Sequence, residues 1–215
     1  MRINNPIKEI AKKEFDRDYF VERVIQEKEV RDLVIHEMLN NEDIMVYYHC
    51  YYVIEEASKK RPELFYSYWD QFRSLLDHKN SYLRNMGLTI MATLTPVDDQ
   101  DRFSEVFEKY MTLMNDEKFM TAQCCIKNLK KIIKQKGHLE EDILEALLDI
   151  DSLCSYPHKQ KELLKGDILE VFDQVYQGCK RKSEIKVLLK KALSSVSPKT
   201  RKRAMDFVEK YQIEI

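Results

Sequence analysis

Apolar and small side chains recur along this chain with the spacing i, i+4, i+7, i+8 and i+11, which places them on one face of an α-helix. Five segments carry this pattern, and the residues at its second position are Cys50, Gly87, Cys125, Ile168 and Ala204. The steps between these positions are 37, 38, 43 and 36 residues. One such segment predicts only an amphipathic helix, but five at a near-constant spacing predict a helical repeat.

A second helical pattern precedes each of these segments. Each repeat is therefore predicted to be a pair of antiparallel helices, and stacked pairs would share one core because a single pair cannot bury its apolar face alone. Another stripe within residues 1–26 predicts an N-terminal cap over the first repeat. The apolar residues of the first helices, repeat by repeat, are Ile35, Met38 and Leu39; Phe65, Trp69, Phe72 and Leu76; Phe103, Phe107, Tyr110 and Met114; Ile143, Leu147 and Ile150; and Ile185, Leu188, Leu189 and Ala192.

Proline and glycine fit these predicted boundaries. Pro62 is expected to open a helix, where its missing N–H costs nothing. Ser197 and Pro198 together predict an N-cap followed by proline at the first helical position. Gly137 and Gly178 follow predicted helix ends, where we expect the left-handed φ that glycine adopts without strain.

The turn and second helix of the second repeat resemble the HEAT-repeat signature. The resemblance rests on a turn Asp, an aliphatic–Arg pair, a small residue and an apolar pair, which are Asp77, Leu83, Arg84, Gly87, Ile90 and Met91. The fifth repeat is similar, with Thr200, Arg201, Ala204, Phe207 and Val208. The other repeats depart from the signature, with Tyr47, Ala122 and Lys165 at the Arg position and Asn40 and Asn115 at the turn.

This resemblance covers residues 28–212 and concerns the HEAT/armadillo class rather than any one member. It implies an all-α fold, namely a right-handed α-α superhelix (a HEAT-like solenoid) of about five helical hairpins with an N-terminal capping helix. The chain, residues 1–215, would then be a single repeat domain with its cap in residues 1–26. In such arrays the second helices line the concave face, which is the usual binding surface.

Composition narrows the possible functions. The chain has 4 Gly and 5 Pro, too few for turn-rich β folds or for the glycine loops that bind nucleotide phosphates. No apolar run approaches the roughly 18 to 20 residues that a membrane helix needs, and the first residues lack the apolar core of a signal peptide. The 5 cysteines are odd in number, and Cys124 and Cys125 are adjacent, which favours reduced thiols. We therefore expect a cytoplasmic protein.

The outward positions of the second helices are the predicted binding surface, because they lie about 160° from the core direction. In the five repeats these positions are Tyr48, Tyr52 and Glu55; Asn85, Thr89 and Ala92; Gln123, Lys127, Lys130 and Lys134; Gly166, Glu170 and Asp173; and Lys202, Asp206 and Glu209. A mixture of aromatic, neutral, basic and acidic groups is typical of a surface that binds a protein or peptide. The predicted partner-binding residues are Tyr48, Tyr52, Glu55, Asn85, Thr89, Lys127, Lys130, Lys134, Glu170 and Asp173.

Two features of the sequence each allow two interpretations. Tyr48 and Tyr52 are either aromatic anchors for a partner or residues covered by the N-terminal cap with only their hydroxyls wet. Residues 174–205 hold ten basic residues and one acidic residue, which would either meet phosphates or an acidic protein or be a solvated helix face. The whole chain has 36 basic and 37 acidic residues, so it is not a general polyanion binder.

Catalysis finds little support in the sequence. There is no phosphate-loop pattern and no Gly-x-Ser-x-Gly motif. Cys154 and His158 could supply two metal ligands, but no second pair follows at zinc spacing. We therefore expect no catalytic residues, no cofactor and no metal site, and we do not expect an enzyme.

One enzymatic class is the alternative. The alkylpurine DNA glycosylases are HEAT-like arrays whose concave face carries Trp platforms, a catalytic Asp and basic residues around DNA. This chain has 1 Trp, and Trp69 lies in a predicted core stripe with Asp70 beside it. The sequence thus favours a protein-interaction scaffold or adaptor, with nucleic-acid binding as the second hypothesis.

Overall fold

The computed structural model describes residues 6–215, and every regular element in this range is a helix. Short 3₁₀ helices join or extend several of the α-helices: η1 (Pro62–Leu64), η2 (Tyr66–Tyr68), η3 (Leu75–Asp77), η4 (Thr95–Val97), η5 (Leu113–Asn115) and η6 (Gly137–Leu139). The α-helices of the described residues are α1 (Pro6–Ile10), α2 (Arg17–Gln26), α3 (Lys28–Asn40), α4 (Ile44–Lys60), α5 (Trp69–Ser74), α6 (Ser81–Leu94), α7 (Arg102–Thr112), α8 (Phe119–Gln135), α9 (Glu140–Leu148), α10 (Ile150–Leu153), α11 (His158–Phe172), α12 (Lys182–Leu193) and α13 (Pro198–Tyr211).

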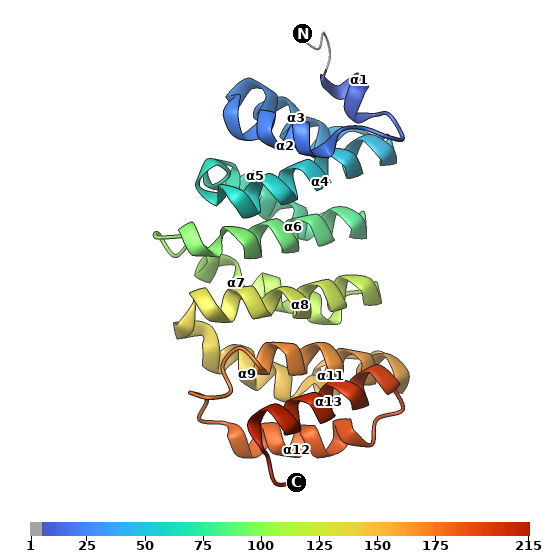
Figure 1. Cartoon of the computed structure of the whole chain (residues 1–215), viewed down its shortest axis with the longest axis vertical. Coiled ribbons are helices and arrows are strands. Elements are labelled where there is room, and N and C mark those ends of the chain that lie inside the picture. The colour runs from blue at the N-terminus through green and yellow to red at the C-terminus, as the bar shows by residue number, and fades with distance from the viewer. Residues whose placement is uncertain (1–5) are drawn as a thin grey trace.

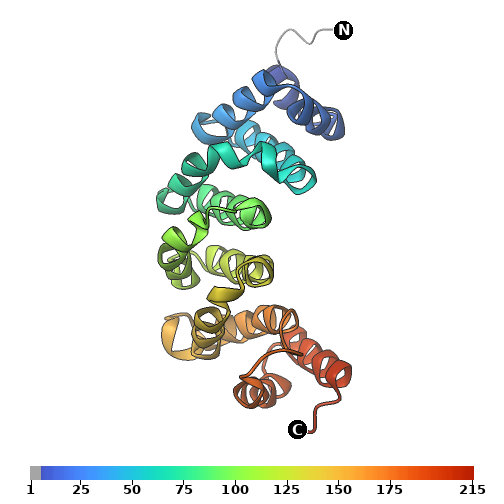
Figure 2. The ribbon, with the colours of Figure 1, turned by 90° about the vertical axis from the view of Figure 1, so that its left-hand side faces the viewer.

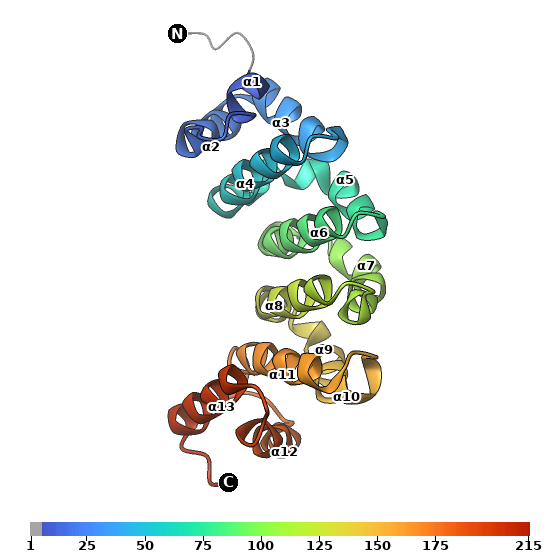
Figure 3. The ribbon, with the colours of Figure 1, turned by 90° about the vertical axis from the view of Figure 1, so that its right-hand side faces the viewer.

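The helices lie in two layers that follow the long axis of the molecule (Figure 1). One layer contains α4, α6, α8, α11 and α13, and each of these packs against the next. We call this layer the inner row, because the molecule curves and these helices lie on the inner side of the curve (Figures 2 and 3). The other layer, which we call the outer row, contains α3, α5, α7, α9 with α10, and α12 (Figure 3).

Side-chain caps fix the start of several helices. Asp16, Asp43, Asn80 and Ser197 each accept a hydrogen bond from a backbone N–H in the first turn of the helix that follows. Such a cap satisfies one of the N–H groups that a helix start leaves without a partner. Ser197 is followed by proline at the first helical position, as the sequence predicts.

The left-handed φ predicted for two glycines is wrong. No glycine in residues 6–215 has a positive φ, which applies to both Gly137 and Gly178. The chain changes direction one residue before Gly137, at Lys136 (φ −118°, ψ 63°), so the glycine can open η6 instead. The left-handed residues in the described chain are Asp101 (φ 54°) and Gln212 (φ 50°).

The first helix of the second repeat is also not continuous. Residues 62–77 form η1, η2, α5 and η3 in succession, although their hydrophobic spacing predicts one helix. The predicted stripe is nevertheless buried, and Phe65, Trp69, Phe72 and Leu76 are each at most 1% exposed. Each 3₁₀ segment is only three residues long, so the change from 3.6 to 3.0 residues per turn does not expose these side chains.

The small residues of the inner-row stripes are buried where helices meet. A Cβ atom on Gly87 would lie 2.8 Å from Leu75 Cβ and 3.1 Å from the Phe72 carbonyl oxygen. Cys50, Cys125 and Ala204 are fully buried. All five cysteines are free thiols. None of the helices in residues 6–215 combines the length and apolar character needed to cross a membrane.

The arginine of the HEAT-like signature holds the turn before its own helix. Arg84 donates from Nη1 to the carbonyl oxygens of His78 (2.8 Å) and Lys79 (3.1 Å), and from Nη2 to Asp116 of the next repeat (2.8 Å). Arg201 likewise donates to a carbonyl oxygen six residues before it. Asp77, the turn Asp of the signature, pairs with Lys109 at the surface.

Candidate functional site

All ten predicted partner-binding residues lie on α4, α6, α8 and α11 of the inner row or at the end of α11, and each is half-buried or exposed. Two other positions that the sequence places outward, Ala92 and Gly166, are buried, so that part of the prediction is wrong. A Cβ atom on Gly166 would lie 2.8 Å from Thr200 Oγ1. The cause is the close packing of α13 against α11, which covers this position.

A cluster of tyrosines occupies the inner row at α4 and α6. The ring of Tyr48 stacks on Tyr47 (5.2 Å between centroids), lies 5.9 Å from Tyr52 and meets Tyr82 of α6 edge-on at 5.5 Å. Burial raises the pKa of Tyr48 to about 12, so its hydroxyl stays protonated at neutral pH. Tyr52 and Tyr82 remain 41% and 52% exposed.

His49 of α4 contacts the N-terminal segment through both aromatic packing and a hydrogen bond. His49 Nδ1 donates to the Ile10 carbonyl oxygen (2.6 Å), and the Phe15 ring stacks on the imidazole at 4.5 Å. Tyr48 is instead partly covered by other tyrosines of α4 and α6. Tyr52 is thus exposed, as the anchor interpretation needs, and Tyr48 is half-buried among tyrosines of α4 and α6.

Polar contacts join α6 to α8 in the middle of the inner row. Thr89 Oγ1 accepts from Asn128 Nδ2 (3.2 Å) and lies 3.4 Å from Cys124 Sγ. Lys131 donates to Thr93 Oγ1 (3.1 Å), and burial lowers the pKa of this lysine. Burial raises the pKa of the Cys124 thiol, which disfavours the nucleophilic thiolate.

A buried carboxylate connects α8, α11 and α13. The Asp167 side chain is 1% exposed and accepts from Arg203 Nη1 (2.6 Å) and Gln123 Nε2 (2.9 Å). Lys127 is farther away, with 3.9 Å between its Nζ and Asp167 Oδ2. Lys130 lies 3.5 Å from Glu170 Oε2. Arg203 therefore makes the closest contact with the acidic face of α11, and the two predicted lysines make weaker ones.

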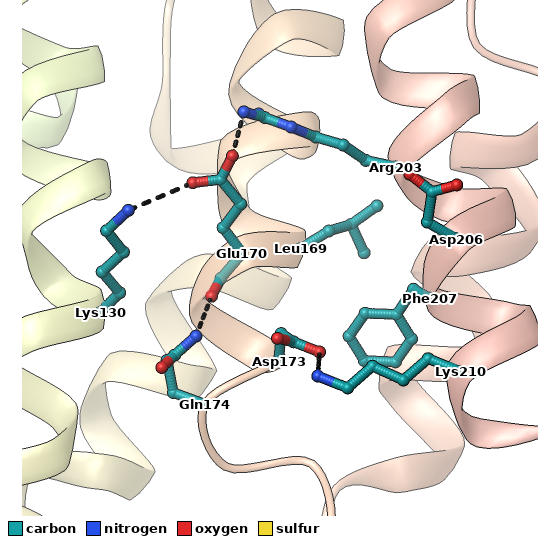
Figure 4. Close-up of a pocket in the computed structure, with 9 residues that line it drawn as sticks. All are labelled: Lys130, Leu169, Glu170, Asp173, Gln174, Arg203, Asp206, Phe207 and Lys210. Carbon is teal, nitrogen blue, oxygen red and sulfur yellow. Dashed lines mark hydrogen bonds and ion pairs between the residues drawn. The ribbon is translucent and has the colours of Figure 1, made fainter.

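A pocket of about 270 Å³ opens beside this carboxylate, between α8, α11 and α13 (Figure 4). Lys130 and Arg203 approach the Glu170 carboxylate from opposite sides, and Lys210 pairs with Asp173 at 2.7 Å. The full lining is Lys130, Leu169, Glu170, Asp173, Gln174, Arg203, Asp206, Phe207 and Lys210. Three cations, three carboxylates and two apolar side chains make this a mosaic recess.

Three residues of this surface were not among the predicted partner-binding residues. Asp167 precedes Ile168 of the apolar stripe, and the sequence does not distinguish it from exposed acids that also lie next to a stripe residue, such as Glu209 beside Val208. Its partner Arg203 lies 36 positions later. Tyr82 lies five residues before Gly87, where the equivalent positions before Cys50 and Cys125 are Met45 and Met120. Tyr82, Met45 and Met120 are all exposed, so aligning the repeats could have revealed this apolar edge.

The inner row thus presents, from α4 to α13, tyrosine rings, neutral polar groups, lysines and a salt-bridged acidic recess. Such a surface can bind by aromatic packing, hydrogen bonding and charge complementarity. Comparison with protein-family models and with curated proteins finds no match to this chain.

Proposed function

We propose that this chain is a protein-interaction scaffold or adaptor, built as a HEAT-like right-handed α-α superhelix, that binds a partner protein or peptide on its concave inner row. Catalysis is not part of the proposal. The support for the superhelix is the stacking of successive helix pairs, the curve they follow and the arginine that holds the turn before α6.

The observation that carries the proposed function is one line of equivalent positions across the five inner helices. These positions, all half-buried or exposed, are Tyr52, Thr89, Lys127, Glu170 and Asp206. Their character changes from aromatic to neutral to basic to acidic within one face. Protein partners match such mosaics, because they can present apolar anchors and both signs of charge in a fixed order.

The nucleic-acid alternative has less support. Phosphates recur along a duplex, so a binding groove needs positive charge along its whole length. At the outward positions of the inner row, lysines lie on α8 and, as Lys202, on α13, and the acidic residues Glu170 and Asp173 at α11 lie between them. The single tryptophan, Trp69, is 1% exposed and lies in the outer row, where it cannot act as a platform for a base.

The test begins with affinity capture of a partner on the immobilised full chain from an extract of its source cells. The recovered partner is then titrated by calorimetry against the wild type and against Lys127→Glu with Lys130→Glu. We expect at least about tenfold weaker binding, which corresponds to about 1.4 kcal/mol. Lys127→Gln with Lys130→Gln removes the charges without repelling Asp167, so it tests the same point in a milder way.

A matched control is available on the outer row. Lys186 and Lys190 lie on α12, and none of the ion pairs in the described chain includes them. Lys186→Glu with Lys190→Glu changes the net charge by the same amount and should leave the affinity within about twofold. Circular dichroism checks that every variant is folded. An inner-row variant that binds as tightly as the wild type would contradict the proposed surface.

A further inference from the structure

The inner row also indicates what kind of segment it binds. We infer that the partner presents an extended acidic segment with an aromatic or apolar anchor about five or six residues from its acidic residues. The anchor packs on Tyr52 and Tyr82, and the acidic residues meet Lys127, Lys130 and Lys134. This inference rests on the proposed function and adds the chemistry and the spacing of the partner.

Uncompensated positive charge in the middle of the inner row is the first observation. Neither α6 nor α8 contains an acidic residue, and α8 contributes the four lysines Lys127, Lys130, Lys131 and Lys134. Lys134 is exposed, and none of the ion pairs in residues 6–215 includes it. The positive charge of α8 must therefore be compensated from neighbouring helices such as α4 and α11 or from outside the molecule.

Asp167 and Glu170 of α11 lie near Lys127 and Lys130, but Arg203 already pairs with both of these carboxylates. Glu55 of α4 acts on Lys131 of α8, but it already pairs with Lys59. Arg203 Nη1 is 2.6 Å from Asp167, and its Nη2 contacts Glu170 directly. Lys127 and Lys130 approach the same two carboxylates only to 3.9 Å and 3.5 Å and stay 40% and 43% exposed. Asp167 and Glu170 thus face the three cations Lys127, Lys130 and Arg203, and Lys134 on α8 adds a fourth, while Asp173 and Asp206 line the recess together with Lys210. The excess beside α8 is positive, and it is complementary to carboxylates on a partner.

The tyrosine cluster supplies the anchor site at the other end of this surface. Tyr52 and Tyr82 leave large parts of their rings exposed, and contacts with Tyr48 hold both rings. Rigid, half-exposed aromatic side chains give large contact areas at little cost in entropy, which is typical of the main anchors of protein interfaces.

The distance between the two regions fixes the spacing. Tyr52, Thr89 and Lys127 occupy equivalent positions on α4, α6 and α8, which pack side by side. Neighbouring helices lie about 8–10 Å apart, so two steps span about 16–20 Å. An extended peptide advances about 3.3 Å per residue and covers this span in about five or six residues. Between the two regions it would cross Asn85 and Thr89, which are uncharged.

An acidic peptide fits this surface better than a single-stranded nucleic acid, although both have negative charge. A nucleic acid carries its charge on every residue, including those that would lie beside Glu55 on α4 and Glu170 on α11. Only a peptide can place an uncharged anchor on the tyrosines and confine its carboxylates to the segment that meets α8.

The test is a random-peptide display selection on the full chain, followed by titration of the enriched peptides as synthetic fluorescent probes. We expect enriched sequences to combine an aromatic or large apolar residue with two or more Asp or Glu residues about five or six positions away. Their affinity should fall at least about tenfold with Lys127→Gln plus Lys130→Gln, and about as much with Tyr52→Ala. It should be unchanged with Lys186→Glu plus Lys190→Glu.

Other outcomes distinguish a wrong acidic segment from a wrong binding surface. Enriched peptides that need Tyr52 but carry no acidic residues would overturn the acidic segment and leave the inner-row surface intact. Enriched peptides unaffected by any inner-row variant would contradict the surface itself. A selection without any enriched sequence, or tight binding of a single-stranded oligonucleotide that depends on Lys127 and Lys130, would overturn the acidic-peptide assignment.

Discussion

Single residues at the contacts between helices hold neighbouring helices in place, either by close packing or by buried hydrogen bonds. Gly87 lies where α6 comes closest to the outer row, with no room for a Cβ atom. Asp98, in the turn between α6 and α7, connects the second and third helix pairs, because it accepts hydrogen bonds from Tyr66 (2.6 Å) and from the backbone N–H of Phe103 (2.9 Å) and pairs with Lys136 (2.9 Å) at the end of α8. The surrounding residues therefore tolerate few other side chains at position 87 or position 98.

Gly87→Ala should therefore destabilise the protein by about 1–3 kcal/mol, because its Cβ would be forced against Leu75 and the Phe72 carbonyl group. Gly137→Ala is the matched control, since a Cβ there meets nothing within 4 Å and its φ is not left-handed. That variant should be neutral or stabilised by up to about 1 kcal/mol. Urea denaturation compares the two, and equal midpoints would contradict the close approach of α6.

Asp98 should give the protein a pH-dependent stability. Burial raises the pKa of this carboxyl, but the hydrogen bonds from Tyr66, Lys136 and the backbone outweigh burial and hold the pKa below the usual 3.8. A group with a lowered pKa in the folded state stabilises the protein above its unfolded pKa, and this contribution is lost as the pH falls through the folded value.

Asp98→Asn should cost about 3 kcal/mol at pH 7, because it leaves the Lys136 ammonium buried with weaker partners. The variant should also lose less of its remaining stability than the wild type between pH 5 and pH 3. Urea titrations at both pH values measure the two differences. A wild type and a variant with parallel pH profiles would show that Asp98 is not linked to proton uptake in this way.

At the scale of helices, hydrogen bonds and ion pairs between residues roughly one repeat apart connect one pair to the next. Three such ion pairs join residues that lie 32 to 38 positions apart in the sequence: Arg84 with Asp116, Lys136 with Asp98, and Arg203 with Asp167. Each pair lies beside buried apolar stripes. Because buried ions cost desolvation energy, losing one partner of such a pair is more damaging than losing a surface ion pair.

Asp116→Asn should lower the free energy of unfolding by about 3 kcal/mol, because Arg84 is 8% exposed and would keep its charge without this carboxylate. Glu22→Gln breaks the pair between Glu22 of α2 and Lys60 of α4, which also joins two helices but is 53% and 47% exposed. Its cost should be below about 1 kcal/mol. Thermal unfolding of the two variants tests the difference, and similar losses would contradict it.

The helical fold and the buried face of each helix were predictable from the sequence, because each stripe follows the 3.6-residue period and the stripes themselves recur. The breaks within residues 62–77 were not predictable, since 3₁₀ and α turns bury the same residues. The partners of Lys127 and Lys130 could not be predicted either, because the arginine that competes for the same carboxylates, Arg203, lies on another repeat. For the same reason the surface near Gly166 was misjudged: its cover comes from α13.

At the scale of the whole molecule, the curve brings side chains of non-adjacent inner helices toward one another. Glu55 on α4, for example, raises the pKa of Lys131 on α8 against the larger opposing effect of burial. The inner row thus carries tyrosines on α4 and α6, lysines on α8 and a salt-bridged recess between α8, α11 and α13, which Figure 4 shows. A partner that extends along the inner row would contact these features in that order.

Photo-crosslinking with the captured partner tests most directly whether that surface is the binding surface. The photoreactive residue p-benzoylphenylalanine replaces either Tyr52 on the inner row or Val187 on the outer-row helix α12, which are 41% and 56% exposed. We predict a strong cross-link to the partner from position 52 and none above background from position 187. Cross-linking from position 187 without any from position 52 would contradict the proposed inner-row interface.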